Sequence, residues 1–207
     1  PPVLDDQWSD IGPSTLIAGD MNAGYFGLVP ASEFITGKEL SSIIGLTAGS
    51  LIYSDTPWMK MALDGEILLV PQKPIRNGIS WSQINARGAV FGTGPSENIS
   101  IQGYSFKARL LKGATVNPVD NLSVPTSTHG SEWNRLMYPI HENALTGEWR
   151  YLSNVENNIP IWNHGEGSGF NGLFSNEDLM PDDLRSWTQE TVIGSYGPWR
   201  LMRGQNS

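Results

Sequence analysis

Short apolar segments separated by glycine and proline dominate the pattern of hydrophobic and polar positions along the chain. Two dipeptides, Asp64-Gly65 and Gln102-Gly103, lie between such segments, and Asp-Gly in particular supplies the positive φ angles of a tight hairpin turn. We therefore predict two β-hairpins. Their strands are expected over 59–63 with 66–70, and over 99–101 with 104–110.

Helix signals are short and few. Residues 36–39 and 80–83 have the spacing of a capping box, in which a hydroxyl and a carboxylate or amide satisfy the exposed amides of a first helical turn. Each predicts a helix of about two turns, the first ending at Gly45. A third short helix is predicted over 131–138, with Trp133 on one face beside Leu136 or Met137.

The two ends of the chain differ in pattern. The first thirty or so residues are rich in glycine and proline, so we predict an irregular arm there. Near the other end, 186–193 and 199–203 are predicted to be paired strands around a turn at 194–198. In the middle of the chain, a polar loop of about twenty residues follows residue 110, and a glycine- and asparagine-rich surface is expected over 154–174.

Composition narrows the class of protein. The 207 residues include 23 glycines, 14 prolines, 8 tryptophans and no cysteine, and the net charge is -8. Eight tryptophans indicate a folded core, and an acidic chain without a basic cluster is not expected to bind nucleic acid. The lack of cysteine excludes disulfides, thiolate zinc sites and cysteine nucleophiles. No apolar run approaches the ~20 residues of a membrane span, so no membrane insertion is expected.

Catalytic and metal motifs are weak. The three histidines, at 129, 141 and 164, have no metal-ligand spacing, and Ser168 lies between glycines without the strand and helix of a nucleophile elbow. We expect no cofactor. Calcium remains an alternative at 176–183, where four carboxylates follow Asn176, although acidic residues also favour a helix start. A carboxylate pair for glycoside hydrolysis also remains open.

Exposed aromatics are the better functional candidates. Tryptophan and tyrosine beside asparagine and glutamate are the residue types that stack on sugar rings or anchor interfaces. Most of the tryptophans are better explained as core, which leaves the glycine-rich loop and the turn near the C-terminus. The candidate ligand-binding residues are Trp162, Asn163, His164, Glu166, Phe170 and Tyr196.

Four segments occur in the order of motifs known from one fold family: 74–81 (PIRNGISW), 107–110 with 131–134 (KARL, SEWN), 186–190 (SWTQE) and 199–204 (WRLMRG). They resemble the C-type lectin-like fold of sulfatase-modifying-factor proteins and phage tropism determinants. The resemblance implies an α+β fold with short twisted antiparallel strands, hairpins, two or three short helices and long irregular loops. The family's oxidase chemistry needs cysteine, which this chain lacks, so the resemblance implies a scaffold without that activity.

A second resemblance covers nearly the whole chain. Segments 19–27, 58–70, 79–81, 104–113 and 130–140 resemble a domain common in virion proteins of tailed bacteriophages. It implies a non-enzymatic structural protein of the virion, assembled in the host cytoplasm, that decorates the head or contributes to a tail fibre or baseplate. Its expected partners are other virion proteins, further copies of itself and a glycan of the host surface.

These resemblances set the expected organisation. Residues 1–45 would form an N-terminal arm and short helix that docks onto the virion or a neighbouring subunit, and residues 46–207 would form the lectin-like domain. Two alternatives stay open for function. The first is a virion enzyme acting on polysaccharide, with Glu and Asp side chains as acid and nucleophile; the second is a purely architectural cement subunit.

Overall fold

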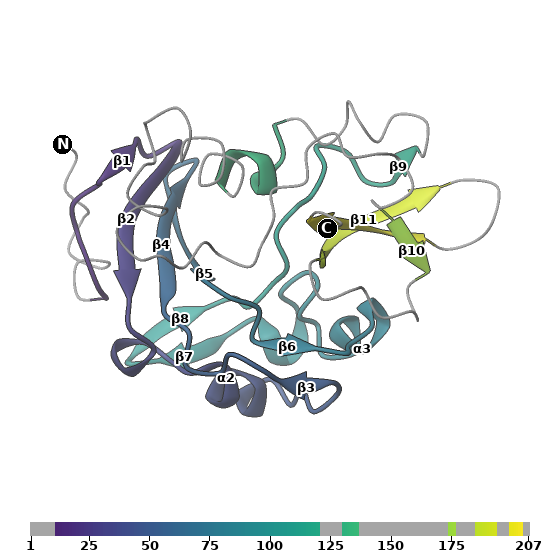
Figure 1. Cartoon of the computed structure of the whole chain (residues 1–207), viewed down its shortest axis with the longest axis horizontal. Coiled ribbons are helices and arrows are strands. Elements are labelled where there is room, and N and C mark those ends of the chain that lie inside the picture. The colour runs from purple at the N-terminus through teal and green to yellow at the C-terminus, as the bar shows by residue number, and fades with distance from the viewer. Residues whose placement is uncertain (1–10, 121–129, 137–173, 177–184, 194–198, 205–207) are drawn as a thin grey trace.

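The computed structural model describes residues 11–120, 130–136, 174–176, 185–193 and 199–204. Short strands form two four-stranded and two two-stranded sheets, joined by few helices (Figure 1). This mixture of small, mostly antiparallel sheets and short helices is compatible with the α+β class expected from the sequence. The elements are β1 (Ala18–Gly19), β2 (Ala23–Val29), η1 (Ala31–Glu33), α2 (Gly37–Ile43), β3 (Ser50–Leu51), β4 (Trp58–Leu63), β5 (Glu66–Pro71), β6 (Arg76–Asn77), α3 (Trp81–Asn85), η2 (Gly94–Ser96), β7 (Ile99–Ile101), β8 (Tyr104–Phe106), β9 (Val119–Asp120), β10 (Phe174–Asn176), β11 (Arg185–Ile193) and β12 (Trp199–Gly204).

Both predicted hairpins are present. β4 and β5 pair antiparallel around Asp64 and Gly65, whose φ angles of 51° and 85° are those of a tight turn. β7 and β8 pair around Gln102 and Gly103, again with positive φ at both positions. The second strand is shorter than predicted. It ends at Phe106, and beyond it the Ala108 amide bonds to the carbonyl of Ser96 instead of continuing the ladder.

The irregular arm predicted for the first thirty residues is wrong over residues 23–29. These form β2, which pairs antiparallel with β4 inside the sheet ordered β1-β2-β4-β5. The register shifts between Tyr25 and Gly27, and Gly27 has a φ of 131° that permits this bulge. The glycines that suggested a loop thus belong to a bulged strand. The division of the chain at residue 45 and the docking of residues 1–45 onto a virion stay predictions.

β4 is buried along its whole length, on both faces of the sheet. Trp58 packs into one hydrophobic cluster with Phe34 and Trp81, while Met59 and Met61 pack into a second cluster on the other face. Side chains alternate between the faces of a strand, so Met59, Met61 and Leu63 share one face while Trp58 lies on the other. The two clusters together make β4 the centre of the described core.

Both capping boxes are present. The Thr36 hydroxyl accepts a hydrogen bond from the Glu39 amide at 3.1 Å, and the Glu39 carboxylate accepts one from the Thr36 amide at 2.9 Å. Ser80 and Gln83 make the same exchange at 3.3 and 3.0 Å. These contacts begin α2 and α3 where the sequence predicts them, because the signal is confined to four consecutive residues.

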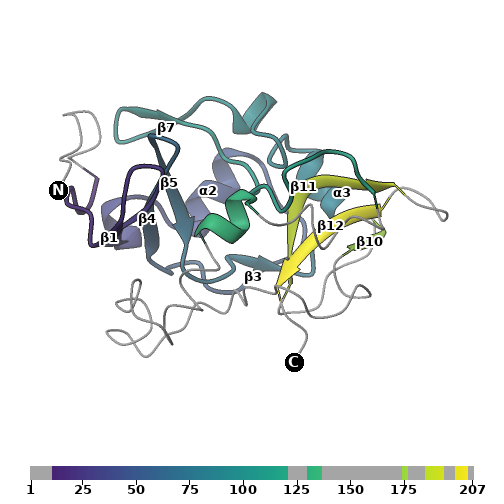
Figure 2. The same cartoon turned by 90° about the horizontal axis from the view of Figure 1, so that it is seen from above.

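A helical turn over 132–136 lies within the third predicted helix; the rest of that prediction is outside the described residues. Trp133 and Leu136 are both buried, as expected for one apolar face. Figure 2 shows this turn between the first sheet and strands β11 and β12. The predicted pairing of those two strands is also present, in a sheet ordered β10-β12-β11-β9 in which β9 and β11 run parallel.

One lysine lies inside the core. Lys60, in β4, is fully buried; its Nζ donates a hydrogen bond to the carbonyl of Ile11 at 2.7 Å and lies 5.5 Å from the centre of the Phe26 ring. Burial disfavours the charged ammonium and lowers the pKa of Lys60 from 10.5 to about 8. The contact ties residue 11 to the middle of the sheet.

The buried lysine predicts a specific pH dependence of stability. Because its pKa is lower in the folded than in the unfolded chain, the unfolded chain binds more protons between pH 8 and 10.5, so the Lys60 contribution rises with pH there. We expect the free energy of unfolding of the native chain to gain about 1–3 kcal/mol relative to Lys60→Met across that range. Urea unfolding of both proteins at several pH values measures this difference. A constant difference would contradict the prediction.

Candidate functional site

The sequence-predicted site residues are not among those the structure describes. Trp162, Asn163, His164, Glu166 and Phe170 lie in the segment 137–173, and Tyr196 lies in 194–198, both outside the described residues. Of the acidic stretch considered for calcium, Asn176 ends β10, and 177–183 also lie outside. The candidate ligand-binding and calcium sites therefore stay predictions.

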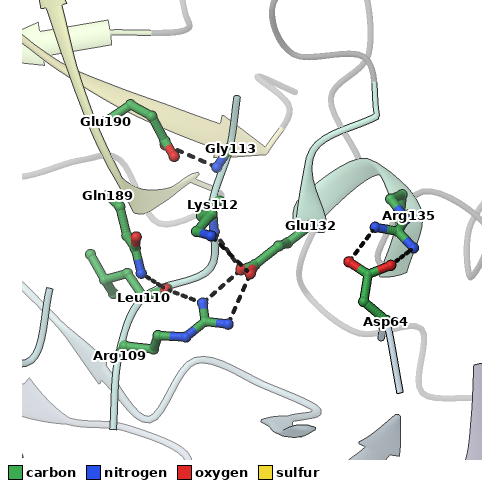
Figure 3. A network of polar contacts seen from close by, with 9 residues as sticks. All are labelled: Asp64, Arg109, Leu110, Lys112, Gly113, Glu132, Arg135, Gln189 and Glu190. Atoms are coloured by element: carbon green, nitrogen blue, oxygen red, sulfur yellow. Dashed lines mark hydrogen bonds and ion pairs between the residues drawn. The ribbon is translucent and has the colours of Figure 1, made fainter. Parts of the chain in front are cut away.

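Among described residues, the most connected polar cluster surrounds Glu132 (Figure 3). Its carboxylate accepts two hydrogen bonds from the Arg109 guanidinium, at 2.6 and 2.8 Å, and one from the Lys112 amide at 2.9 Å. Arg109 in turn donates to the carbonyl of Leu110. A two-pronged pair of this kind fixes orientation. It holds the helical turn over 132–136 against the segment 107–113.

Two further carboxylates in Figure 3 also serve as acceptors for structural donors. Asp64, in the β4–β5 turn, pairs with both terminal nitrogens of Arg135, and the pairing lowers the pKa of Asp64. Glu190 is buried in β11 and accepts a hydrogen bond from the Gly113 amide at 2.9 Å. Burial raises the pKa of Glu190. Both groups join separate elements, which is a structural role.

An open groove lies beside the turn between β3 and β4. It has a volume of about 620 Å³ and is lined by Tyr53, Asp55 and Thr56 from the turn and by Leu28 and Lys73 from other segments. A second hollow of about 540 Å³ shares Leu28 and Asp55 with the first. The two form one extended depression, of a size typical of sites that take small molecules.

The groove combines an aromatic ring with several polar groups. The Tyr53 side chain is 41% exposed, and the Lys73 ammonium lies 5.3 Å from the centre of its ring, a favourable cation–π contact. Asp55 is exposed and accepts a hydrogen bond from the Ser54 hydroxyl at 3.2 Å. Thr56 is buried, and its hydroxyl lacks a hydrogen-bond partner within the described part of the chain.

Sequence reasoning missed this groove, although a local signal existed. Residues 54–57 (Ser-Asp-Thr-Pro) are turn-forming types directly after an apolar run that ends in Tyr53, which is the pattern of an ordered polar turn that presents an aromatic ring. The residues that complete the groove could not have been found this way. Leu28 and Lys73 come from segments about twenty residues distant on either side, and only the pairing of β2, β4 and β5 brings them together.

The described ranges contain neither a cluster of metal ligands nor a membrane-spanning helix. There, no three His, Asp or Glu side chains gather as ligands for a metal ion. None of the described helices has the length and apolar character needed to cross a bilayer.

Replacing the charged side chain of Glu132 or of Asp64 by its neutral amide is expected to lower the free energy of unfolding by different amounts. Glu132 has a side chain 11% exposed and accepts three hydrogen bonds, so Glu132→Gln should lower the free energy of unfolding by about 1–3 kcal/mol. Asp64 is 66% exposed and its pair is screened by solvent, so the matched Asp64→Asn change should cost much less. Urea unfolding at one pH compares the two variants, and equal losses would refute this ranking.

Comparison with known proteins adds no relative to these observations. No family model, no curated protein and no solved structure matches the chain. The function is therefore argued from the contacts described above and from the sequence motifs.

Proposed function

We propose that the protein is a non-enzymatic structural protein of a tailed-phage virion, built on a lectin-like domain, that decorates the particle or contributes to attachment at a tail fibre or baseplate. The observation that carries the proposal is the position of the motif tryptophans. Trp81, Trp133 and Trp187, one from each of three motif segments, are all at most 4% exposed. Motif residues that form a core are what a shared scaffold requires.

A binding role suits the described polar groups better than a catalytic one. Glycoside hydrolysis needs two carboxyl groups that face a substrate across a cleft. Glu132, Asp64 and Glu190 instead accept hydrogen bonds from Arg109, Arg135 and the Gly113 amide, respectively. Groups engaged in this way position elements of the fold, whereas the exposed ring of Tyr53 is available for contact with a ligand.

The proposed setting follows from the virion resemblance. The protein would assemble with other virion proteins and with further copies of itself in the host cytoplasm, and residues 1–45 would dock onto the particle or a neighbouring subunit. A cysteine-free chain suits this history, because it works both in a reducing cytoplasm and outside the cell. Its attachment role would be exerted on a glycan of the host surface.

Labelling of purified phage particles tests the proposal. An antibody raised against the protein is expected to label particles of the phage that encodes the chain, at fixed positions seen by electron microscopy, and to reduce adsorption to host cells. Labelling without any effect on adsorption would favour the architectural cement role. Absence of the protein from washed particles would refute the virion assignment.

A turnover assay separates binding from catalysis. Incubation of the purified chain with host surface polysaccharide should leave the polysaccharide intact, because no described carboxylate pair is placed for hydrolysis. The measurement is the release of reducing ends over time, with a buffer blank as control. Steady release proportional to protein concentration would instead establish the enzyme alternative.

A further inference from the structure

We infer that the groove beside the β3–β4 turn, lined by Tyr53, Asp55, Thr56, Leu28 and Lys73, is a binding site for a neutral pyranose unit of a saccharide. The inference rests on the proposed attachment function and gives it a place in the fold. It concerns residues far in sequence from the glycine-rich loop that the sequence analysis favoured.

The aromatic wall gives the site its apolar contact. Tyr53 is 41% exposed, and the Lys73 ammonium lies 5.3 Å from the centre of its ring, a contact that restrains the ring. The C–H face of a pyranose is apolar and matches an aromatic ring of this size, and tyrosine loses little conformational entropy on binding. Leu28, half-buried in the groove lining, adds apolar surface.

The polar groups suit sugar hydroxyls. The Asp55 carboxylate is exposed and accepts a single hydrogen bond among the described residues, from Ser54. A carboxylate has two oxygens and can accept from two neighbouring hydroxyls of a sugar. Lys73 also lines the groove and supplies donors, so the groove carries one side chain of each charge. This balance, on a chain with a net charge of -8, favours a neutral over an anionic saccharide.

Thr56 is the second, independent indication of a ligand. Its side chain lines the groove, yet its hydroxyl is buried and has no hydrogen-bond partner in the described part of the chain. A polar atom left in this state costs about 1–3 kcal/mol and calls for a functional explanation. Rotation of the Thr56 side chain would expose this hydroxyl to the groove, where a sugar hydroxyl would supply the missing partner.

The groove is held in place before any ligand arrives. The backbone of the turn is bonded to α2 and to the segment 72–75: the Gly37 amide donates to the Ser54 carbonyl at 2.7 Å, the Gln72 amide to the Pro57 carbonyl at 2.9 Å, and the Ile52 amide to the Ile75 carbonyl at 3.2 Å. Gly37 is needed for this approach, because a Cβ there would lie 2.8 Å from the Ile75 side chain. A preorganised wall lowers the entropy cost of binding.

The extent of the depression indicates more than one sugar unit. The adjoining hollow continues from Leu28 and Asp55 towards Ser32, whose hydroxyl adds a further polar contact. Two hollows of this size can hold neighbouring units of one chain, with Asp55 between them. A single glycoside would occupy the half that contains Tyr53.

Saturation-transfer NMR on the full chain tests the site. The probes are the methyl glycosides of glucose, galactose, mannose and N-acetylglucosamine, with methyl glucuronide as the anionic comparison. At least one neutral glycoside is expected to receive saturation from the protein, and Tyr53→Ala should weaken its binding about tenfold or more. Phe91→Ala is the matched control, because Phe91 is an aromatic residue with the same 41% exposure that does not line the groove.

A second variant separates binding from folding. Thr56→Val keeps the shape of the side chain and removes the unpartnered hydroxyl, so it should leave the unfolding temperature equal or higher while weakening glycoside binding several-fold. If Thr56 had only a structural role, its replacement by valine would not weaken glycoside binding while the unfolding temperature stayed equal or rose.

Three results would overturn the site. These are no transfer to any neutral glycoside, transfer to the glucuronide alone, or equal binding by Tyr53→Ala and Phe91→Ala. None of them changes the antibody labelling of particles, so failure of the site and failure of the virion assignment are distinguishable.

Discussion

Two buried tryptophans attach the C-terminal strands to the rest of the molecule, because each indole donates a hydrogen bond to a backbone carbonyl next to the other tryptophan's segment. The Trp81 indole, at the start of α3, donates to the carbonyl of Thr188 at 2.9 Å, and the Trp187 indole donates back to the carbonyl of Ile79 at 3.1 Å. The Arg200 guanidinium lies 3.8 Å from the Trp81 ring and adds a third contact. The sheet of β11 and β12 therefore depends on a site more than a hundred residues earlier in the chain.

Polar contacts are also concentrated around the segment 107–113, which likewise attaches parts of the chain that are distant in sequence. This segment binds both the helical turn over 132–136 and β11 through its own backbone. Lys112 donates to Glu132, Gly113 donates to Glu190, and the carbonyl of Leu110 accepts from Gln189. A Cβ at Gly113 would lie 2.7 Å from Thr188, so the approach depends on glycine. The two tryptophan hydrogen bonds and this segment together make one connected core.

Local signals predicted local structure, and long-range structure escaped prediction. The capping boxes and the turn at Asp64-Gly65 were found because two to four adjacent residues determine them. β2 was missed because its partner β4 begins some thirty residues later and its bulge at Gly27 breaks the alternation of apolar and polar residues. The groove beside Tyr53 was missed for the same reason, since its walls come from three segments. The site expected around Trp162 lies in a stretch that the structure does not describe.

The buried lysine has a consequence for chemical labelling. An amine-reactive reagent modifies only a neutral, accessible amine, and the Nζ of Lys60 is fully enclosed and bonded to the carbonyl of Ile11. Its modification must wait until residue 11 separates from β4, so the rate of labelling at this one position reports how often the first sheet opens. Lys73, on the groove, reacts without such opening and supplies the internal reference. The labelling rate at Lys60 relative to that at Lys73 thus measures local opening of the core in the unmodified sequence.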